Sequence, residues 1–163
     1  MNDLHWISAV FSPTGGTAAI AKAITGGHGH VVDLSVPAPV TPVADSTVLL
    51  AAAPVFGWRI PAVALERLAA LSGSGPAVAV AVYGNRDYDD ALTELQDLLE
   101  GNGFRVVAAG AFIGRHSIFP KVAEGRPDQA DLALMAAFGD KCREKLAAFD
   151  PAAHVRQIGR AHV

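Results

Sequence analysis

The 163-residue chain has a single cysteine, Cys142, and only 18% charged and 7% aromatic residues. One cysteine cannot close an internal disulfide or complete a cysteine-based zinc site. The six histidines show no metal-ligand spacing supported by acids, so we expect no metal ion. The net charge of −3 gives no electrostatic basis for general nucleic-acid binding. With 51% hydrophobic residues, this composition indicates one globular domain with a sizeable core.

Long hydrophobic runs are missing as well. The longest, Val48 to Phe56, is far shorter than the ~20 residues that a membrane-spanning helix needs. The first residues, Met1 to His5, lack the basic residues and the apolar stretch of a signal peptide. We therefore expect no membrane insertion and a cytoplasmic location.

Short apolar runs and helical patterns alternate along the chain. Nearly continuous apolar runs are typical of parallel strands covered on both faces. They lie at Ile7–Phe11, Val48–Ala53, Ala77–Tyr83 and Val106–Phe112, with a weaker run at Val31–Leu34. Helical patterns lie at Thr17–Ile24, Pro61–Leu71, Asp89–Glu100 and Asp128–Phe149. This alternation predicts an α/β fold with a parallel sheet.

Two segments depart from the alternation. The connection Ser35 to Ser46 contains three prolines, which predicts an extended, irregular link where the alternation leads one to expect a helix. The stretch 151–163 has no apolar periodicity. We therefore divide the chain into a domain at 1–150 and a C-terminal tail at 151–163.

The first predicted strand leads into a loop that is rich in glycine and hydroxyl groups. Its residues are Ser12, Pro13, Thr14, Gly15, Gly16 and Thr17. A strand–loop–helix junction directs backbone N–H groups and the helix dipole at an anion. No lysine follows the glycines as in a Walker loop, and the Gly-x-Gly-x-x-Gly signature is absent. The loop thus predicts a phosphate site built from neutral donors; the alternative is a plain turn with a threonine helix cap.

This loop resembles the phosphate loop of the flavodoxin family, Ser/Thr-x-Thr-Gly-x-Thr. Ser12, Thr14, Gly15 and Thr17 match that pattern, and the opening is similar to flavodoxin domains fused to bacterial ferredoxins. The resemblance implies that the loop binds the 5′-phosphate of FMN. It also implies a three-layer sandwich with a five-stranded parallel sheet of order 2-1-3-4-5. In this chain a Pro-rich loop replaces the helix between strands 2 and 3.

Two further loops lie where the resemblance implies flavin-binding loops. The first contains Pro54, Val55, Phe56, Gly57, Trp58 and Arg59, and the second Tyr83, Gly84, Asn85, Arg86 and Tyr88. Trp58 and Tyr88 are the expected stacking residues for the isoalloxazine ring. Gly57 suits a peptide that turns over on flavin reduction. The alternatives are that Phe56 and Trp58 pack on the core or at a protein contact, and that the second loop is an ordinary turn.

The predicted rim differs from that of acidic flavodoxins, because it carries several cations. Arg59, Arg86, Arg115, His116 and Lys121 lie there, alongside Asp87. Cations near the flavin favour its anionic reduced form, so we expect a less negative hydroquinone potential and an acidic partner. The alternative is that these arginines are solvated surface groups. His116 is either a surface or turn residue or a catalytic group beside the flavin.

The leading functional prediction is an FMN-binding electron-transfer protein whose redox partner is ferredoxin-like or another acidic protein. No residue is then required as a catalytic acid or base. One alternative is an FMN-dependent NAD(P)H:quinone-type reductase. A further alternative is a flavin-free interaction module on the same fold. The oligomeric state does not follow from the sequence.

Overall fold

The computed structural model describes residues 5–13, 15–37, 41–56, 59–84, 90–114, 125, 127–149 and 161–162. The main sheet contains β1 (His5–Val10), β2 (His30–Asp33), β4 (Thr47–Pro54), β6 (Pro76–Tyr83), β7 (Arg105–Ile113) and β8 (Ala161–His162). A small second sheet pairs β3 (Thr41–Pro42) with β5 (Leu71–Ser72). The helices are α1 (Gly16–Thr25), α2 (Ala62–Ala69), α3 (Ala91–Gly101) and α4 (Gln129–Ala147).

The main sheet is entirely parallel and has the order β2-β1-β4-β6-β7-β8. Its first five strands correspond to the predicted order 2-1-3-4-5, so the predicted fold class is confirmed. The sixth strand was not predicted. It pairs Ala161 and His162 with Gly110 and Ala111 on the open edge of β7. Such short pairing rests on backbone groups of an edge strand, and it leaves no apolar pattern in the sequence.

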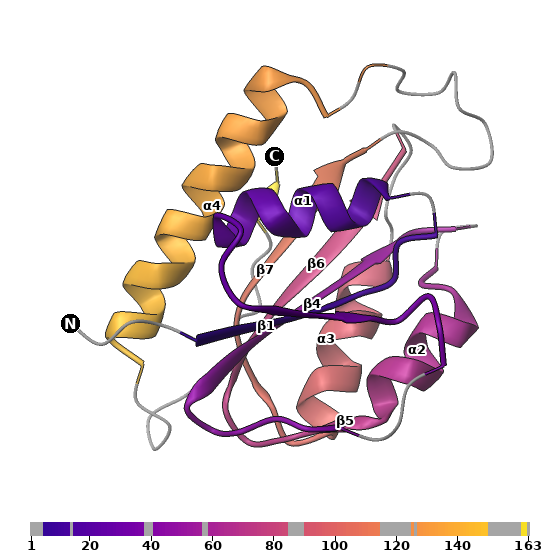
Figure 1. Ribbon diagram of the computed structural model, residues 1–163, viewed down its shortest axis with the longest axis vertical. Helices are drawn as coiled ribbons and strands as arrows, with labels where there is room; N and C mark the ends of the chain where they lie inside the picture. Colours follow the sequence, from indigo (N-terminus) through magenta and orange to yellow (C-terminus); the bar gives the residue numbers. More distant parts are fainter. Residues whose placement is uncertain are drawn as a thin grey trace.

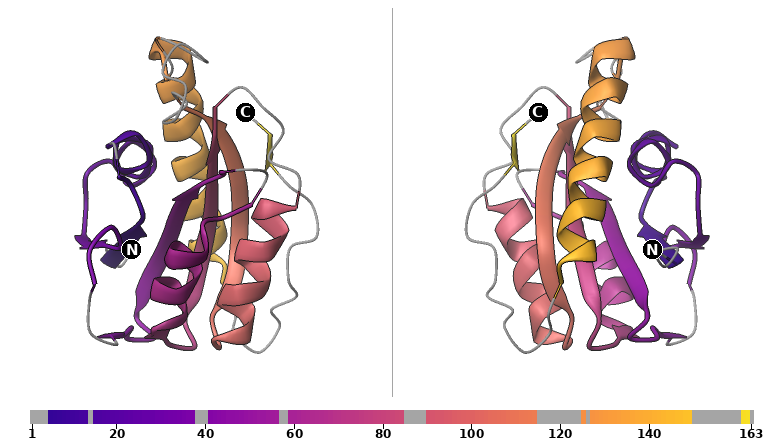
Figure 2. Two further views of the ribbon diagram at one scale, coloured as in Figure 1. Left: turned by 90° about the vertical axis from the view of Figure 1, so that its right-hand side faces the viewer. Right: turned by 90° about the vertical axis from the view of Figure 1, so that its left-hand side faces the viewer.

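Helices cover both faces of the sheet, which gives three layers (Figures 1 and 2). Alternate residues of each central strand point to opposite faces. In β4, Val48 and Leu50 join the core beneath α1 and α4, whereas Leu49 and Ala51 join the core beneath α2 and α3. All four are buried, and this explains why the strand reads as a continuous apolar run.

Helix α1 is held at a fixed place by a close crossing with α4. A Cβ on Gly139 of α4 would lie 2.1 Å from the backbone oxygen of Ile24, so only glycine permits this approach. Arg143 Nη1 also donates to the Ile24 oxygen at 3.5 Å, near the C-terminal end of α1. The helix that follows the predicted phosphate loop is therefore anchored at its far end.

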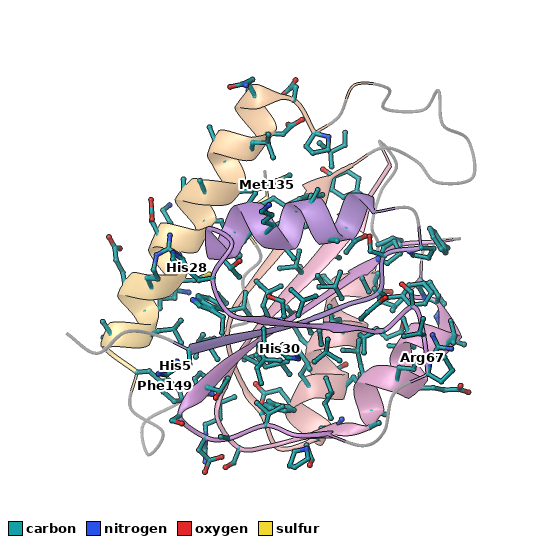
Figure 3. The ribbon with its side chains drawn as sticks, in the orientation of Figure 1. His5, His28, His30, Arg67, Met135 and Phe149 are labelled. Carbon is teal, nitrogen blue, oxygen red and sulfur yellow. The ribbon has the colours of Figure 1, made fainter. Side chains whose placement is uncertain are left out.

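The Pro-rich connection between β2 and β4 contains no helix in its described parts, 34–37 and 41–46, as predicted. Leu34 and Val43 from this connection are buried in the core beneath α2 and α3. Arg67 of α2 donates to the Leu34 backbone oxygen at 2.6 Å and ties the connection to the helix (Figure 3). Two apolar residues on this face, Ile7 and Val32, remain only half-buried.

The predicted helix boundaries needed small corrections. Helix α2 ends at Ala69, before the predicted Leu71, because Leu71 and Ser72 form β5. Helix α3 begins at Ala91, and Asp90 occupies its N-cap position. At the start of α4, Asp128 and Asp131 form a reciprocal capping box.

Candidate functional site

The three predicted loops leave neighbouring strands at one edge of the sheet. The first follows β1, the second β4 and the third β6, and these strands are adjacent. Backbone hydrogen bonds continue past the strand ends, from Phe11 N to Ala52 O at 3.0 Å and from Val55 N to Val82 O at 2.8 Å. The edge is the carboxyl edge, next to the switch in strand order between β1 and β4. Open α/β sheets bind ligands at such a place, and flavodoxin is itself the standard example of this rule.

The first loop needs a glycine at its bend. Gly15 is the N-cap of α1 and has φ of 89° in the left-handed region, where a side chain is strained. A Cβ built on Gly15 or on Gly16 meets no atom within 4 Å. The loop therefore opens onto free space, and a ligand can approach its backbone.

The start of α1 presents unused hydrogen-bond donors. Within the described residues, the N–H groups of Gly16 and Thr17 have no acceptor, whereas Ala18 N donates to Ser12 Oγ at 3.0 Å. Thr17 is only 5% exposed. Because Thr17 lies inside the helix and Gly15 caps it, the threonine-cap alternative does not hold for Thr17. Two N–H groups without a described acceptor, together with the Thr17 hydroxyl beside them, form a donor set that suits a phosphate.

Ser12 is held by a series of hydrogen bonds that reaches back to β2. Its N–H donates to Ser35 Oγ at 3.0 Å, and Ser35 N donates to Asp33 Oδ1 at 2.9 Å. Ser35 and Asp33 were not predicted as site residues. Ser12 and Ser35 are 23 positions apart, and only the pairing of β1 with β2 brings them together.

The second loop contains a tight turn. Phe56 N donates to Arg59 O at 2.8 Å, and Arg59 N donates to Phe56 O at 3.1 Å. Val55 and Phe56 are half-buried and pack against the core beneath α2 and α3. Phe56 therefore packs on the core in part.

Arg59 is not the isolated cation that its place on the rim suggests. Its guanidinium donates to Oε2 of Glu94 in the first turn of α3 and forms an ion pair with it. The hydrogen bond to Glu94, and then the charge of Glu94, raise the pKa of Arg59 above its ordinary value. Glu94 was also missed from the sequence, because α3 lies 35 residues from Arg59.

The third loop is described only at its beginning. Tyr83 is half-buried against the core beneath α2 and α3, and its backbone oxygen accepts from Gly114 N at 2.8 Å. Several predicted site residues lie outside the described residues: Thr14, Gly57, Trp58, Asn85, Arg86 and Tyr88. Asp87, Arg115, His116 and Lys121 of the predicted rim lie outside them as well. Of the predicted site, the structure brings together 12–13, 15–17, 54–56, 59 and 83–84.

Other chemistry-bearing groups lie away from this edge. Cys142 is buried, and its burial raises the pKa of the thiol to about 12. In the described part of the chain, no group of three or more His, Cys, Asp or Glu residues is arranged to hold a metal ion. No described helix is long and apolar enough to cross a membrane.

Comparison with known proteins identifies the fold. No family model and no curated protein sequence matches the chain. An NADH:FMN oxidoreductase in its apo form matches at a TM-score of 0.64 and 16% identity, over 93% of this chain and 95% of that one. Reduced flavodoxin from Megasphaera elsdenii matches at 0.51 and 15%, over 83% and 98%.

Larger proteins contain the same fold as a part. Rubredoxin oxygen:oxidoreductase from Desulfovibrio gigas matches at a TM-score of 0.61 and 14% identity, over 91% of this chain. This chain spans only 37% of that protein's length. At such identities the similarity concerns the fold alone, and on that level the resemblance drawn from the sequence is confirmed: the chain has a flavodoxin-like fold.

Proposed function

We propose that the chain binds FMN at the carboxyl edge of the sheet and transfers electrons between redox partners. The start of α1 is the observation that carries this proposal. Gly16 and Thr17 have backbone N–H groups free of described acceptors, and Gly15 bends the loop in front of them. The bound FMN would supply the redox chemistry, while the protein holds the cofactor and controls access to it.

Neutral donors would hold the phosphate. Between Phe11 and Ile24 there is no acidic residue, and Lys22 is the only basic one. The dipole and the free N–H groups of α1 would therefore replace positive side chains. Thr14 and the Ser12 hydroxyl complete the proposed phosphate loop.

The ring would lie between the second and third loops. The Phe56–Arg59 backbone pairing supports this, because it holds the ends of the second loop beside the strand that leads to the third loop. We propose Trp58 or Tyr88 as the stacking residue, and the Gly57 peptide as the group that responds to reduction. The remaining loop residues, Asn85 and Arg86 among them, would border the ring edge.

A comparison of flavins tests the phosphate site. Calorimetric titrations of cofactor-stripped protein with FMN, riboflavin and FAD should give the tightest binding for FMN at one molecule per chain. Riboflavin lacks the phosphate and should bind about 100-fold more weakly, given the usual value of charge-assisted hydrogen bonds. Equal affinity for FMN and riboflavin would contradict the proposed phosphate site. Tighter binding of FAD than of FMN would mean that FAD, not FMN, is the cofactor.

A second candidate is an FMN-dependent NAD(P)H-driven reductase. It is supported by the match to an NADH:FMN oxidoreductase, which covers 93% of this chain and 95% of that one. Anaerobic mixing of the FMN-loaded protein with NADH or NADPH separates the two functions. Rapid bleaching of the flavin absorbance supports the reductase. Bleaching only after addition of a reduced partner, such as a ferredoxin, supports the electron carrier. We propose the cytoplasm as the location of this carrier.

A further inference from the structure

The 56–59 turn has one ionic link to the rest of the described structure. Arg59 of the second loop reaches across to Glu94 of α3, the helix that follows the third loop in the chain. The Arg59 side chain is 73% exposed and that of Glu94 is 25% exposed. The pair thus joins an exposed guanidinium of the second loop to a partly buried carboxylate on a helix.

The carboxylate of Glu94 depends strongly on this contact. Its second oxygen, Oε1, is buried and has no hydrogen-bond partner among the described residues. A partly buried carboxylate without a counter-charge is costly, whereas a neutral amide of the same shape is tolerated more easily. Removing Arg59 should therefore disturb this region more than neutralising Glu94.

The pair also decides the net charge of the second loop. An unpaired Arg59 would present a full positive charge beside the proposed ring site, but Glu94 offsets it. A charge near the flavin acts on its reduced, anionic form more than on its neutral, oxidised form. The two members of the pair should thus act on the flavin with opposite signs.

We propose that the Arg59–Glu94 ion pair clamps the 56–59 turn to α3 and, by balancing the Arg59 charge, sets how strongly this loop favours the reduced form of a bound flavin. The second half rests on the proposed function, whereas the first half concerns the protein alone. Both residues are positioning residues in this scheme.

The flavin half is tested with E94Q, R59Q and the double variant. Oxidised FMN binding is titrated, and the potential is measured by dithionite titration, in which dithionite gives two electrons and solvent one proton. These two measurements together give the ratio of the dissociation constants of reduced and oxidised FMN. E94Q should shift this ratio on the order of threefold in favour of the reduced form, and R59Q by a similar factor against it. The double variant should return close to wild type.

A matched control separates the effect of the local charge on the flavin from a general effect of removing a carboxylate. D140N also removes one carboxylate from an arginine pair, with Arg143 on α4. It should leave the ratio unchanged. Shifts of the same sign in E94Q and R59Q would indicate a merely structural effect and overturn the charge-balance half, as would shifts no larger than that of D140N.

The clamp half is tested on the protein without flavin. Hydrogen exchange is followed at the Phe56 and Arg59 amides, which the turn protects. Exchange at both should become several-fold faster in E94Q and not in D140N. Unchanged exchange would overturn the clamp. Absence of FMN binding in the wild type would instead refute the proposed function and the flavin half, and would leave the exchange result to decide the clamp.

Discussion

The first and second loops of the site are fixed in different ways. The loop at 12–17 is held by uncharged donors, through Ser12 to Ser35 on one side and to Ala18 on the other. The turn at 56–59 is closed by its own backbone but linked to the helix beyond by the charged Arg59–Glu94 pair. The loop proposed for a charged phosphate is thus neutral, and the loop proposed for an uncharged ring carries the charge.

This difference has a physical reason. Backbone N–H groups at a helix start bind an anion at fixed geometry and need no side-chain ordering. A turn beside a ring that gains a negative charge can influence that charge only through nearby charges or dipoles. The first loop should accordingly govern affinity, and the second should govern the relative affinity for the two redox forms.

The largest effect should come from the bend of the first loop. G15V places a β-branched residue at φ of 89°, a conformation that costs an ordinary residue about 1–2 kcal/mol or more. FMN affinity should fall tenfold or more in a fluorescence titration. G16A is the matched control, since Gly16 has no positive φ and an added Cβ meets nothing. Its affinity should stay within about threefold of wild type.

Loss of the Ser35 hydroxyl should have the next largest effect. S35A leaves the Ser12 N–H without its acceptor, which costs about 1 kcal/mol and should weaken FMN binding about fivefold. S74A removes a comparable serine contact, with Asp45, far from the loops. Equal FMN affinity in S35A and S74A would show that the link to β2 does not position the phosphate loop.

Much of this fold could be predicted from local pattern. The buried strands read as apolar runs because helices cover both of their faces, as β4 shows. Pro37 and Pro42 in the connection correctly indicated that no helix follows β2 in the described parts. The two-residue strands β3, β5 and β8 could not be predicted, because pairing of so few residues rests on backbone groups alone.

The candidate site was predictable where one segment carries it. Gly15 and Gly16 signalled the first loop because the bend and the helix start are consecutive in the chain. Ser35 and Glu94 gave no such signal, since their partners lie 23 and 35 positions away. The charge balance at Arg59 could therefore be found only in the folded structure.

Salt should change amide exchange in the second loop but not in the first, and this effect should be smaller than those of the two substitutions above. Raising sodium chloride from about 0.05 M to about 0.5 M shortens the screening length roughly threefold and weakens exposed ion pairs. The Phe56 amide should then exchange faster by about twofold, while the Ser12 amide should not respond. A salt response of the same size at both amides would remove the distinction between a neutral and a charged loop.

Cys142 lies outside both loops, so the loop variants should not change its effect on the pH dependence of stability. Burial raises its pKa from 9.0 to about 12. Between these two pH values the thiol therefore stays protonated in the folded protein, whereas it loses its proton in the unfolded chain. The free energy of unfolding should therefore decline as pH rises from about 9 toward 12, and less steeply in C142A. Urea unfolding at several pH values measures this, with G15V and E94Q expected to show the wild-type pH dependence.

A fluorescence titration of FMN with the cofactor-stripped wild type and the G15V and G16A variants examines the proposed flavin site on the first loop itself. We expect strong quenching by a stacked aromatic ring and saturation at one FMN per chain with sub-micromolar affinity. Wild type and G16A should behave alike, and G15V should bind far more weakly. No quenching by the wild type, or equal binding by G15V and G16A, would contradict a flavin site built on the first loop.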